Sequence, residues 1–336
     1  MASRSGTRQA RYWPARRGSQ CFKSGPACYA GSRNGSAHTL DPIAEEGRRL
    51  SEGRMVSTNE QESATLRAWS QSAPYWFKHV DAIRAMFEPL SDALIEDAAI
   101  GPGTSTLDVA AGTGEPSLRI AETCGPSAAV TCTDPVAGMV AAARQEAGRR
   151  GLRNVSFARC AAGALPFRAG CFDAVVCRLG IMFFSDPIAS LREMLRVLDP
   201  GGRLAIAVWH GADVNPFFRV SLQVIARYAR LPAVGPDAPG AFRYAEPGKL
   251  ARLFALAGAA AVEERVVGFR IAAPIRSTDF WALRFEMSET LRAVLPQLSP
   301  EQLCAAKADL EQAVRPYFPD DQMNFPAQAI IVTGRK

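Results

Sequence analysis

Hydrophobic residues recur at helical spacing in the segment 57–100. This periodicity predicts a helical cap ahead of the main domain. Pro74 and Pro89 lie inside the pattern and should interrupt it, because proline lacks the N–H that an inner helical position donates. We therefore expect two or three short helices. The apolar positions are Leu66, Trp69, Ala73, Trp76, Val80, Ile83, Met86 and Phe87.

From residue 101 the pattern changes to apolar runs of strand length that alternate with helical stretches. This alternation indicates a parallel sheet with crossover helices on both faces. We predict an α/β fold: a Rossmann-like, doubly wound, mostly parallel seven-stranded sheet in a domain over 101–336, with helical insertions at 211–261 and 272–326. The predicted strands cover 105–110, 128–134, 154–160, 172–178, 203–209, 262–271 and 327–334.

The first 56 residues are rich in Gly, Ser and Arg and show no apolar period. This composition is typical of disorder, so we interpret 1–56 as a disordered basic leader. Two alternatives stay open. The segment lacks acids before Asp41, as organellar transit peptides do, and Met55 could be the true start of translation.

The net charge of +6 resides in this leader. Residues 1–56 carry ten Lys/Arg and four Asp/Glu, and residues 57–336 carry 29 of each sign. A neutral folded part does not predict a nucleic-acid partner. No apolar run reaches the roughly 20 residues of a membrane span, so none is predicted.

The eight cysteines form no C-x-x-C pair, and most of those beyond residue 100 lie in apolar, strand-like runs. This usage is typical of reduced thiols in a cytoplasmic protein and favours neither a disulfide framework nor a zinc site. We predict a cytoplasmic protein without a metal.

The stretch "LDVAAGTGEPS" (107–117) places a glycine turn directly after the first predicted strand. In an open parallel sheet, ligands bind beyond the carboxyl ends of the strands. Gly112 and Gly114 let a ligand approach the backbone, and a helix beginning near Pro116 directs its N–H groups at an anionic group. The turn predicts a site for an adenosine-like molecule that carries a carboxylate or phosphate.

Two cofactors fit this description. A dinucleotide favours G-x-G-x-x-G, but Ser117 stands at the third glycine and Glu115 would repel a phosphate. Asp134, which ends the second strand, could bind ribose hydroxyls of either a dinucleotide or an adenosyl nucleoside. The residues therefore lean away from a pyrophosphate.

"LDVAAGTG" resembles the first motif of class I S-adenosylmethionine-dependent methyltransferases, and "TDPVAGM" resembles their second-strand acid. "AAGALPF", "FDAVVCRLGIMFFSDP" and "LREMLRVLDPGGRLAIAVW" resemble later motifs of the small-molecule branch that includes the ubiquinone/menaquinone-type methyltransferases. The resemblance covers about 105–210. It implies that S-adenosylmethionine is the cofactor and S-adenosylhomocysteine the product.

The resemblance also implies a set of cofactor contacts. Asp134 would bind the ribose, Met139 would pack on adenine, and Asp108 would order the glycine turn or reach the methionine amino group. Two departures stand out, since Ala110 replaces a glycine, and Ala161 and Gly163 replace acids that often bind the adenine amine. The full set is Asp108, Ala110, Gly112, Thr113, Gly114, Asp134, Pro135, Met139, Ala162, Gly163, Cys177 and Arg178.

Catalytic and substrate residues are harder to predict. His210 follows the fifth strand and His79 lies in the cap, so either is a candidate base. We predict Trp76, Phe183 and Trp209 as acceptor contacts, because they lie in the cap or at strand ends. The N-[DN]-P-P-[YF] motif of amino methylation is absent.

We predict a methyltransferase acting on oxygen or carbon of a small, partly apolar molecule. The alternatives are an NAD(P)-dependent oxidoreductase and a non-catalytic S-adenosylmethionine-binding protein. The sequence predicts neither the acceptor nor the oligomeric state.

Overall fold

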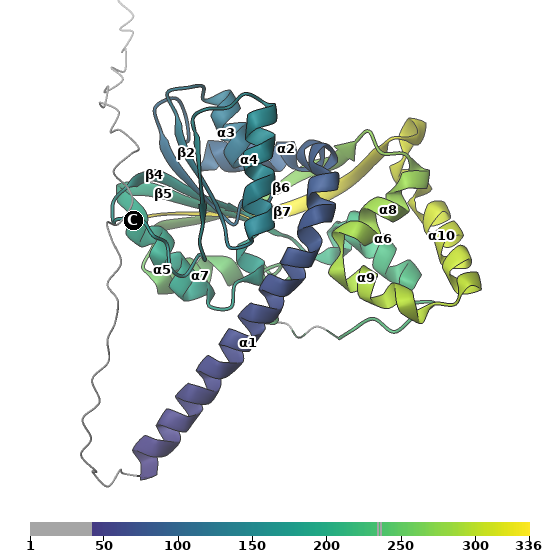
Figure 1. Cartoon of the computed structure of the whole chain (residues 1–336), viewed down its shortest axis with the longest axis horizontal. Helices are drawn as coiled ribbons and strands as arrows, with labels where there is room; N and C mark the ends of the chain where they lie inside the picture. Colours follow the sequence, from purple (N-terminus) through teal and green to yellow (C-terminus); the bar gives the residue numbers. More distant parts are fainter. Residues whose placement is uncertain (1–41, 234, 236) are drawn as a thin grey trace, which may run out of the picture.

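The computed structural model describes the backbone of residues 42–233, 235 and 237–336, and the side chains from Glu60 onward. Residues 1–41 of the predicted leader (1–56) lie outside the described part. In Figure 1 the long helix α1 runs between a sheet with its helices and a separate group of helices, α6 and α8–α10.

The centre of the fold is a seven-stranded sheet in the order β3-β2-β1-β4-β5-β7-β6. Strands β1 to β5 pair in parallel, and β7 pairs antiparallel with both β5 and β6. This confirms the predicted Rossmann-like α/β fold with a mostly parallel sheet. The strands are β1 (Ser105–Val109), β2 (Ala129–Asp134), β3 (Val155–Arg159), β4 (Phe172–Arg178), β5 (Leu198–Trp209), β6 (Ala260–Ala273) and β7 (Met323–Arg335).

Helices cover both faces of the sheet. On one face α2 (Val80–Asp97) and α3 (Ser117–Thr123) pack against alternate residues of the strands, and α4 (Ala137–Arg149) extends this layer. On the other face lie α5 (Pro187–Val197) and α7 (Lys249–Ala257). In β4, Ala174 and Val176 belong to the first layer, and Val175 and Cys177 belong to the second. Burial on both faces explains why the central strands read as continuous apolar runs.

The cap consists of α1 (Pro42–Lys78) and α2, and two details of its prediction were wrong. The proline positions lie inside helices, and the break falls at His79 instead. Pro89 removes only one backbone hydrogen bond, and α2 is held by its buried face, from Ile83 to Leu94. In addition, α1 begins at Pro42, so residues 42–56 of the predicted disordered leader are helical here. Proline at the first helical position suits this start.

The helical insertions follow β5 and β6, as predicted. The first contains α6 (Pro216–Ile225) and α7, and the second contains α8 (Ser277–Met287), α9 (Glu289–Val294) and α10 (Pro300–Val314). Several short helices are of the 3-10 type: Ile181–Phe183, Ala212–Val214, Leu295–Gln297, Arg315–Tyr317 and Pro319–Asp321. No helix among the described residues is long and apolar enough to cross a membrane.

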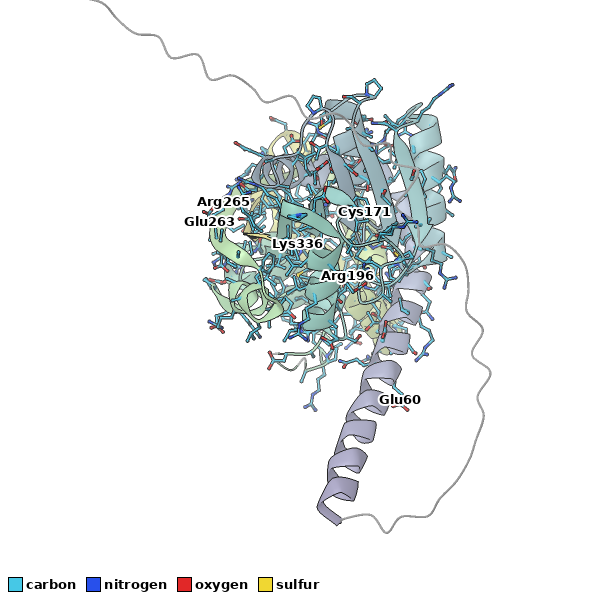
Figure 2. All side chains as sticks on the ribbon, turned by 90° about the vertical axis from the view of Figure 1, so that its left-hand side faces the viewer. Glu60, Cys171, Arg196, Glu263, Arg265 and Lys336 are labelled. Atoms are coloured by element: carbon cyan, nitrogen blue, oxygen red, sulfur yellow. The ribbon has the colours of Figure 1, made fainter. Side chains whose placement is uncertain are left out.

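The last residue is held against the end of α5 and the start of β5. The Lys336 ammonium donates to the carbonyls of Arg196, at 2.9 Å, and Leu198, at 2.6 Å, and Figure 2 shows Lys336 close to Arg196. The fifth strand begins earlier than the predicted 203–209. β5 already starts at Leu198, with an irregular register between Phe172 and Ala174 on β4.

Candidate active site

The glycine turn follows β1, and its two glycines are required for different reasons. Ala110 has a φ of 58° and Gly112 has the same φ, so both adopt the left-handed region. A Cβ on Gly112 would meet no atom within 4 Å, whereas a Cβ on Gly114 would lie 2.9 Å from Leu118 Cδ1. Gly112 therefore satisfies a backbone requirement, and Gly114 allows α3 to pack closely.

Asp134, at the end of β2, is held by this turn. Its Oδ2 accepts a hydrogen bond from the Gly112 N–H at 3.0 Å, and its Oδ1 accepts one from the Val136 N–H at 2.8 Å. Burial raises the pKa of Asp134 to about 6, although the two N–H donors lower it. The carboxylate keeps free lone pairs on both oxygens, so it can accept further hydrogen bonds from a ligand.

Asp108 supports the turn from within the sheet. It is fully buried, and its Oδ2 accepts from the Ser117 N–H at 2.9 Å and the Ser117 hydroxyl at 2.6 Å. Ser117, which replaces the third glycine of a dinucleotide motif, thus anchors the start of α3. The other oxygen, Oδ1, is buried and has no hydrogen-bond partner among the described residues. Burial raises the pKa of Asp108 to about 7, against the lowering effect of Ser117 and of the Arg178 charge.

A cavity of about 420 Å³ opens at the carboxyl ends of β1, β2 and β4. Nine of the predicted site residues line it. They are Ala110, Asp134, Pro135, Met139, Ala162, Gly163 and Arg178, predicted for the cofactor, and Trp76 and Phe183, predicted for the acceptor. Asp108, Gly112, Thr113, Gly114 and Cys177 lie outside this lining, so their contact with a cofactor stays a prediction.

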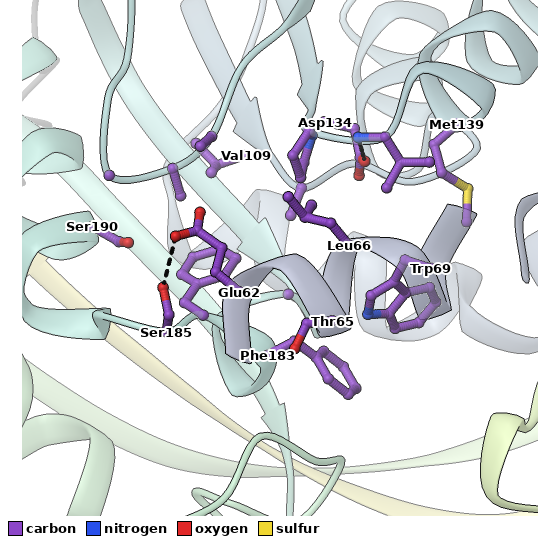
Figure 3. A pocket seen from close by; sticks show the side chains of 18 of the residues that line it. Glu62, Thr65, Leu66, Trp69, Val109, Asp134, Met139, Phe183, Ser185 and Ser190 are labelled. Carbon is purple, nitrogen blue, oxygen red and sulfur yellow. Dashed lines mark hydrogen bonds between the residues drawn. The ribbon is translucent and has the colours of Figure 1, made fainter. Parts of the chain in front are cut away.

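Helix α1 covers this cavity. Figure 3 shows Glu62, Leu66 and Trp69 of α1 on one side and Asp134 and Met139 on the other. The Ser185 hydroxyl donates to Glu62 at 3.3 Å and links the helix to the opposite wall. No sequence motif marks these α1 residues. Their helical period predicts only that one face of α1 is buried.

A second cavity of about 590 Å³ adjoins the first. Trp209, predicted as an acceptor contact, lines this one, together with Phe217 and Phe218. Most of its lining comes from the cap and the insertions, namely α1, α6, α8, the start of α9 and the loop before α7. The residues that line both cavities and mark their border are Thr65, Trp69, Trp76, Phe87, Leu179 and Phe183.

Arg178 lies at the first cavity, at the end of β4. Its guanidinium donates to the Ser91 hydroxyl at 2.7 Å and lies 5.6 Å from the centre of the Phe87 ring. Burial lowers the pKa of Arg178, and the charges of Glu115 and Asp108 oppose that shift. Next to it, Gly180 leaves no room for a side chain, since a Cβ there would lie 2.7 Å from Ala110 Cβ. Residues 178–180 form the part of the wall nearest the glycine turn, and the sequence motifs did not single out Leu179 or Gly180.

The structure places neither candidate base in the lining of the two cavities. The His210 ring nitrogen Nδ1 accepts a hydrogen bond from the Gly211 N–H at 2.6 Å. The His79 Nε2 lies 2.5 Å from Glu286 Oε2 on α8, and Lys78 pairs with the same carboxylate at 2.7 Å. His79 thereby joins the cap to the second insertion. The catalytic role of either histidine stays a prediction.

This contact gives a stability prediction. His79→Ala should reduce the free energy of unfolding by about 1 kcal/mol, because a partly buried hydrogen bond between the start of α2 and α8 is lost. Lys78→Ala is the matched control, and it should cost less, because the Lys78 side chain is 58% exposed. Urea unfolding followed by circular dichroism measures both. Equal losses for the two variants would contradict this role of His79.

Among the described residues, no group of three His, Cys, Asp or Glu side chains is placed to hold a metal ion. Burial raises the pKa of the Cys177 thiol to about 12, so it stays protonated at neutral pH. Cys177 contributes to the core beneath Gly180.

The strand order separates this fold from dinucleotide-binding sheets. Those sheets have the order 3-2-1-4-5-6 with parallel strands, whereas here the antiparallel β7 lies between β5 and β6. Residues 107–206 match the family described as a methyltransferase domain. The ubiquinone/menaquinone biosynthesis C-methyltransferase of Hahella chejuensis is 30% identical over 171 residues, which cover 47% of this chain and 68% of that protein. The chain belongs to the class I S-adenosylmethionine-dependent methyltransferases. The resemblance inferred from the sequence motifs is thus confirmed. Neither the strand order nor the family supports the alternative of an NAD(P)-dependent oxidoreductase.

Two further similar proteins do not narrow the function of this methyltransferase. An uncharacterized protein of Mycobacterium tuberculosis is 33% identical over 184 residues, covering 55% of this chain and 64% of the relative. The match thus spans slightly under two thirds of that relative's length. The solved structure of the YcgJ protein from Bacillus subtilis superposes with a TM-score of 0.48 at 18% identity, covering 74% of this chain and 98% of that one.

Proposed function

We propose that this protein transfers a methyl group from S-adenosylmethionine to oxygen or carbon of a small, partly apolar acceptor. The observation that carries the proposal is the pair of adjoining cavities. One is built by the family's motifs at the carboxyl ends of the strands, and the other is built by the cap and the insertions. The cofactor would occupy the first and the acceptor the second.

The residues of the first cavity fit S-adenosylmethionine. Asp134 offers carboxylate lone pairs to the ribose hydroxyls, and Met139 gives an apolar surface for adenine. The buried Oδ1 of Asp108 lacks a partner among the described residues, which suits a nearby ammonium group reached directly or through water. When bound, S-adenosylmethionine supplies an electrophilic methyl group on a sulfonium.

The chain's own contribution is to orient and enclose the reactants. Proximity and alignment supply much of the rate of an in-line displacement. The cover formed by α1 and the aromatic side chains at the border between the cavities would limit the access of water once both molecules are bound. The border residues contain no acid, histidine, lysine, cysteine or tyrosine. We therefore propose that the acceptor enters already able to react, without a side-chain base at the border.

The pKa of Asp134 gives a pH prediction. Its carboxyl has a pKa of about 6, so it is charged above that pH and gains a proton below it. A protonated carboxyl is a poorer acceptor for ribose hydroxyls. The affinity for S-adenosylhomocysteine should therefore fall as the pH drops from 7 to 5, and protonation of Asp108, whose pKa is about 7, adds to the fall at the upper end of this range.

Titration calorimetry across this range measures the effect. Asp134→Asn is the control, because its side chain does not titrate, and its affinity should be weaker and should change less than that of the wild type between pH 6 and 5. A wild-type affinity that stays constant down to pH 5 would contradict the assigned role of the carboxylate.

The proposed reaction is tested with S-adenosylmethionine labelled in its methyl group and a panel of aromatic alcohols, phenols and acids. Formation of S-adenosylhomocysteine together with a labelled product supports the proposal. A protein that binds S-adenosylhomocysteine but transfers no label to any acceptor would instead favour the non-catalytic alternative.

A further inference from the structure

Arg284 is a buried cation in the second cavity. It lies on α8, is only 4% exposed and lines the cavity near Phe217 and Phe218. Its Nε donates to the Phe217 carbonyl at 3.1 Å. The two terminal nitrogens have no hydrogen bond to any described residue, and no described carboxylate lies within ion-pair distance of the guanidinium. Arg284 thus differs from most buried charges, which are paired.

A guanidinium without a counter-charge is expensive to bury. Burial lowers the pKa of Arg284 to about 10, and no neighbouring acid opposes that shift. The side chain still carries its charge at neutral pH. An uncharged side chain of similar size would avoid the free-energy cost of burying a charge. A bound anion would explain why a cation stands here.

The contacts of the guanidinium leave its two terminal nitrogens without a hydrogen-bond partner among the described residues. Its central carbon lies 4.5 Å from the centre of the Phe217 ring and 5.3 Å from that of Phe218. These contacts hold the group by cation–π attraction and restrict its rotation. The terminal nitrogens of a fixed guanidinium match the two oxygens of a carboxylate.

No described acid of the cavity forms an ion pair with Arg284. Its other charged lining residues are Arg243 and Glu289. Arg243 donates from Nη1 to the Phe184 carbonyl at 2.6 Å, and Glu289 is exposed at the start of α9. The remaining lining is mostly apolar and aromatic. The cavity therefore combines an apolar body with a net positive charge.

We propose that Arg284 binds a carboxylate of the methyl acceptor, which is therefore an organic acid with an apolar or aromatic body. This inference rests on the proposed function and narrows its substrate class. Arg284 lines the second cavity only and is absent from the border with the first. The carboxylate is held away from the border, and the reacting atom is another oxygen or a carbon of the same molecule.

The test compares two probes of nearly equal shape, 2-naphthoate and 2-naphthamide, that differ in charge. Binding of each is measured by calorimetry to the full chain saturated with S-adenosylhomocysteine. We expect wild type to bind the naphthoate at least tenfold more tightly than the naphthamide. Arg284→Met, which keeps the length of the apolar stem, should abolish that preference, and Arg284→Lys should retain part of it.

Arg243→Met is the matched control, because it removes the other arginine of the same cavity, whose Nη1 is already bonded to a backbone carbonyl. It should change the preference less than threefold. Equal binding of both probes by wild type, no detectable binding of naphthoate, or a preference that survives Arg284→Met would each overturn the proposal. The wild-type comparison decides even if a variant fails to fold.

The two proposals fail in different ways. Binding of S-adenosylhomocysteine is measured in the same titrations before either probe is added. Its absence would count against the proposed function, whereas its presence with equal binding of the two probes would count against Arg284 alone.

Discussion

Replacing Asp134 by alanine is expected to weaken the binding of S-adenosylhomocysteine by about 1–3 kcal/mol, since charge-assisted hydrogen bonds to the ribose are lost. The loss has a second source. The carboxylate also accepts the N–H groups of Gly112 and Val136, so the variant frees the glycine turn. Calorimetric titration of the purified variant measures the affinity.

Asp173→Ala is the matched control for this variant. The Asp173 Oδ2 accepts the Ser105 N–H at 2.8 Å. It too links the end of one strand to its neighbour, but at the amino ends of β1 and β4, away from the cavity. Its removal should leave the affinity unchanged. An Asp134→Ala variant that binds as tightly as wild type would refute the assignment of the first cavity to the cofactor.

The second large effect is expected for Gly114→Ala, which should reduce the free energy of unfolding by about 3 kcal/mol. Gly114 has a φ of 111°, which side chains rarely allow, and its new Cβ would lie 2.9 Å from Leu118 Cδ1 and 3.2 Å from Ala143 Cβ. Both neighbours are fully buried and cannot move away easily.

Gly112→Ala is the matched control, because it lies in the same turn without either severe demand. Its φ of 58° is one that Ala110, which carries a side chain, also adopts, and its Cβ would meet no atom within 4 Å. We expect a loss of only about 1 kcal/mol. Urea unfolding of both variants gives the comparison, and equal losses would contradict the greater demand of backbone and packing at Gly114.

The sheet could be predicted because its signals are local. Each central strand is a short apolar run buried on both faces, and Asp186 caps α5 as its position before Pro187 predicts, accepting the Ala189 N–H at 2.9 Å. The end of β2 likewise brings Asp134 to the glycine turn, because parallel strands end at one edge of the sheet.

What the sequence did not predict depends on contacts between distant segments. The residues of α1 meet the cavity through packing on Val136 and Met139, and no local pattern encodes that partner. His79 was a candidate base, but Glu286, more than 200 residues away, places it at a helix contact. Arg284 also gave no signal, because an arginine in a helix is usually exposed.

The measurement that tests the central claim most directly is calorimetric titration of the full chain with S-adenosylhomocysteine, beside NADH. The two adjoining cavities and family membership lead us to expect micromolar binding of S-adenosylhomocysteine and none of NADH. Binding of NADH, or of neither molecule, would contradict the assignment of the first cavity to S-adenosylmethionine.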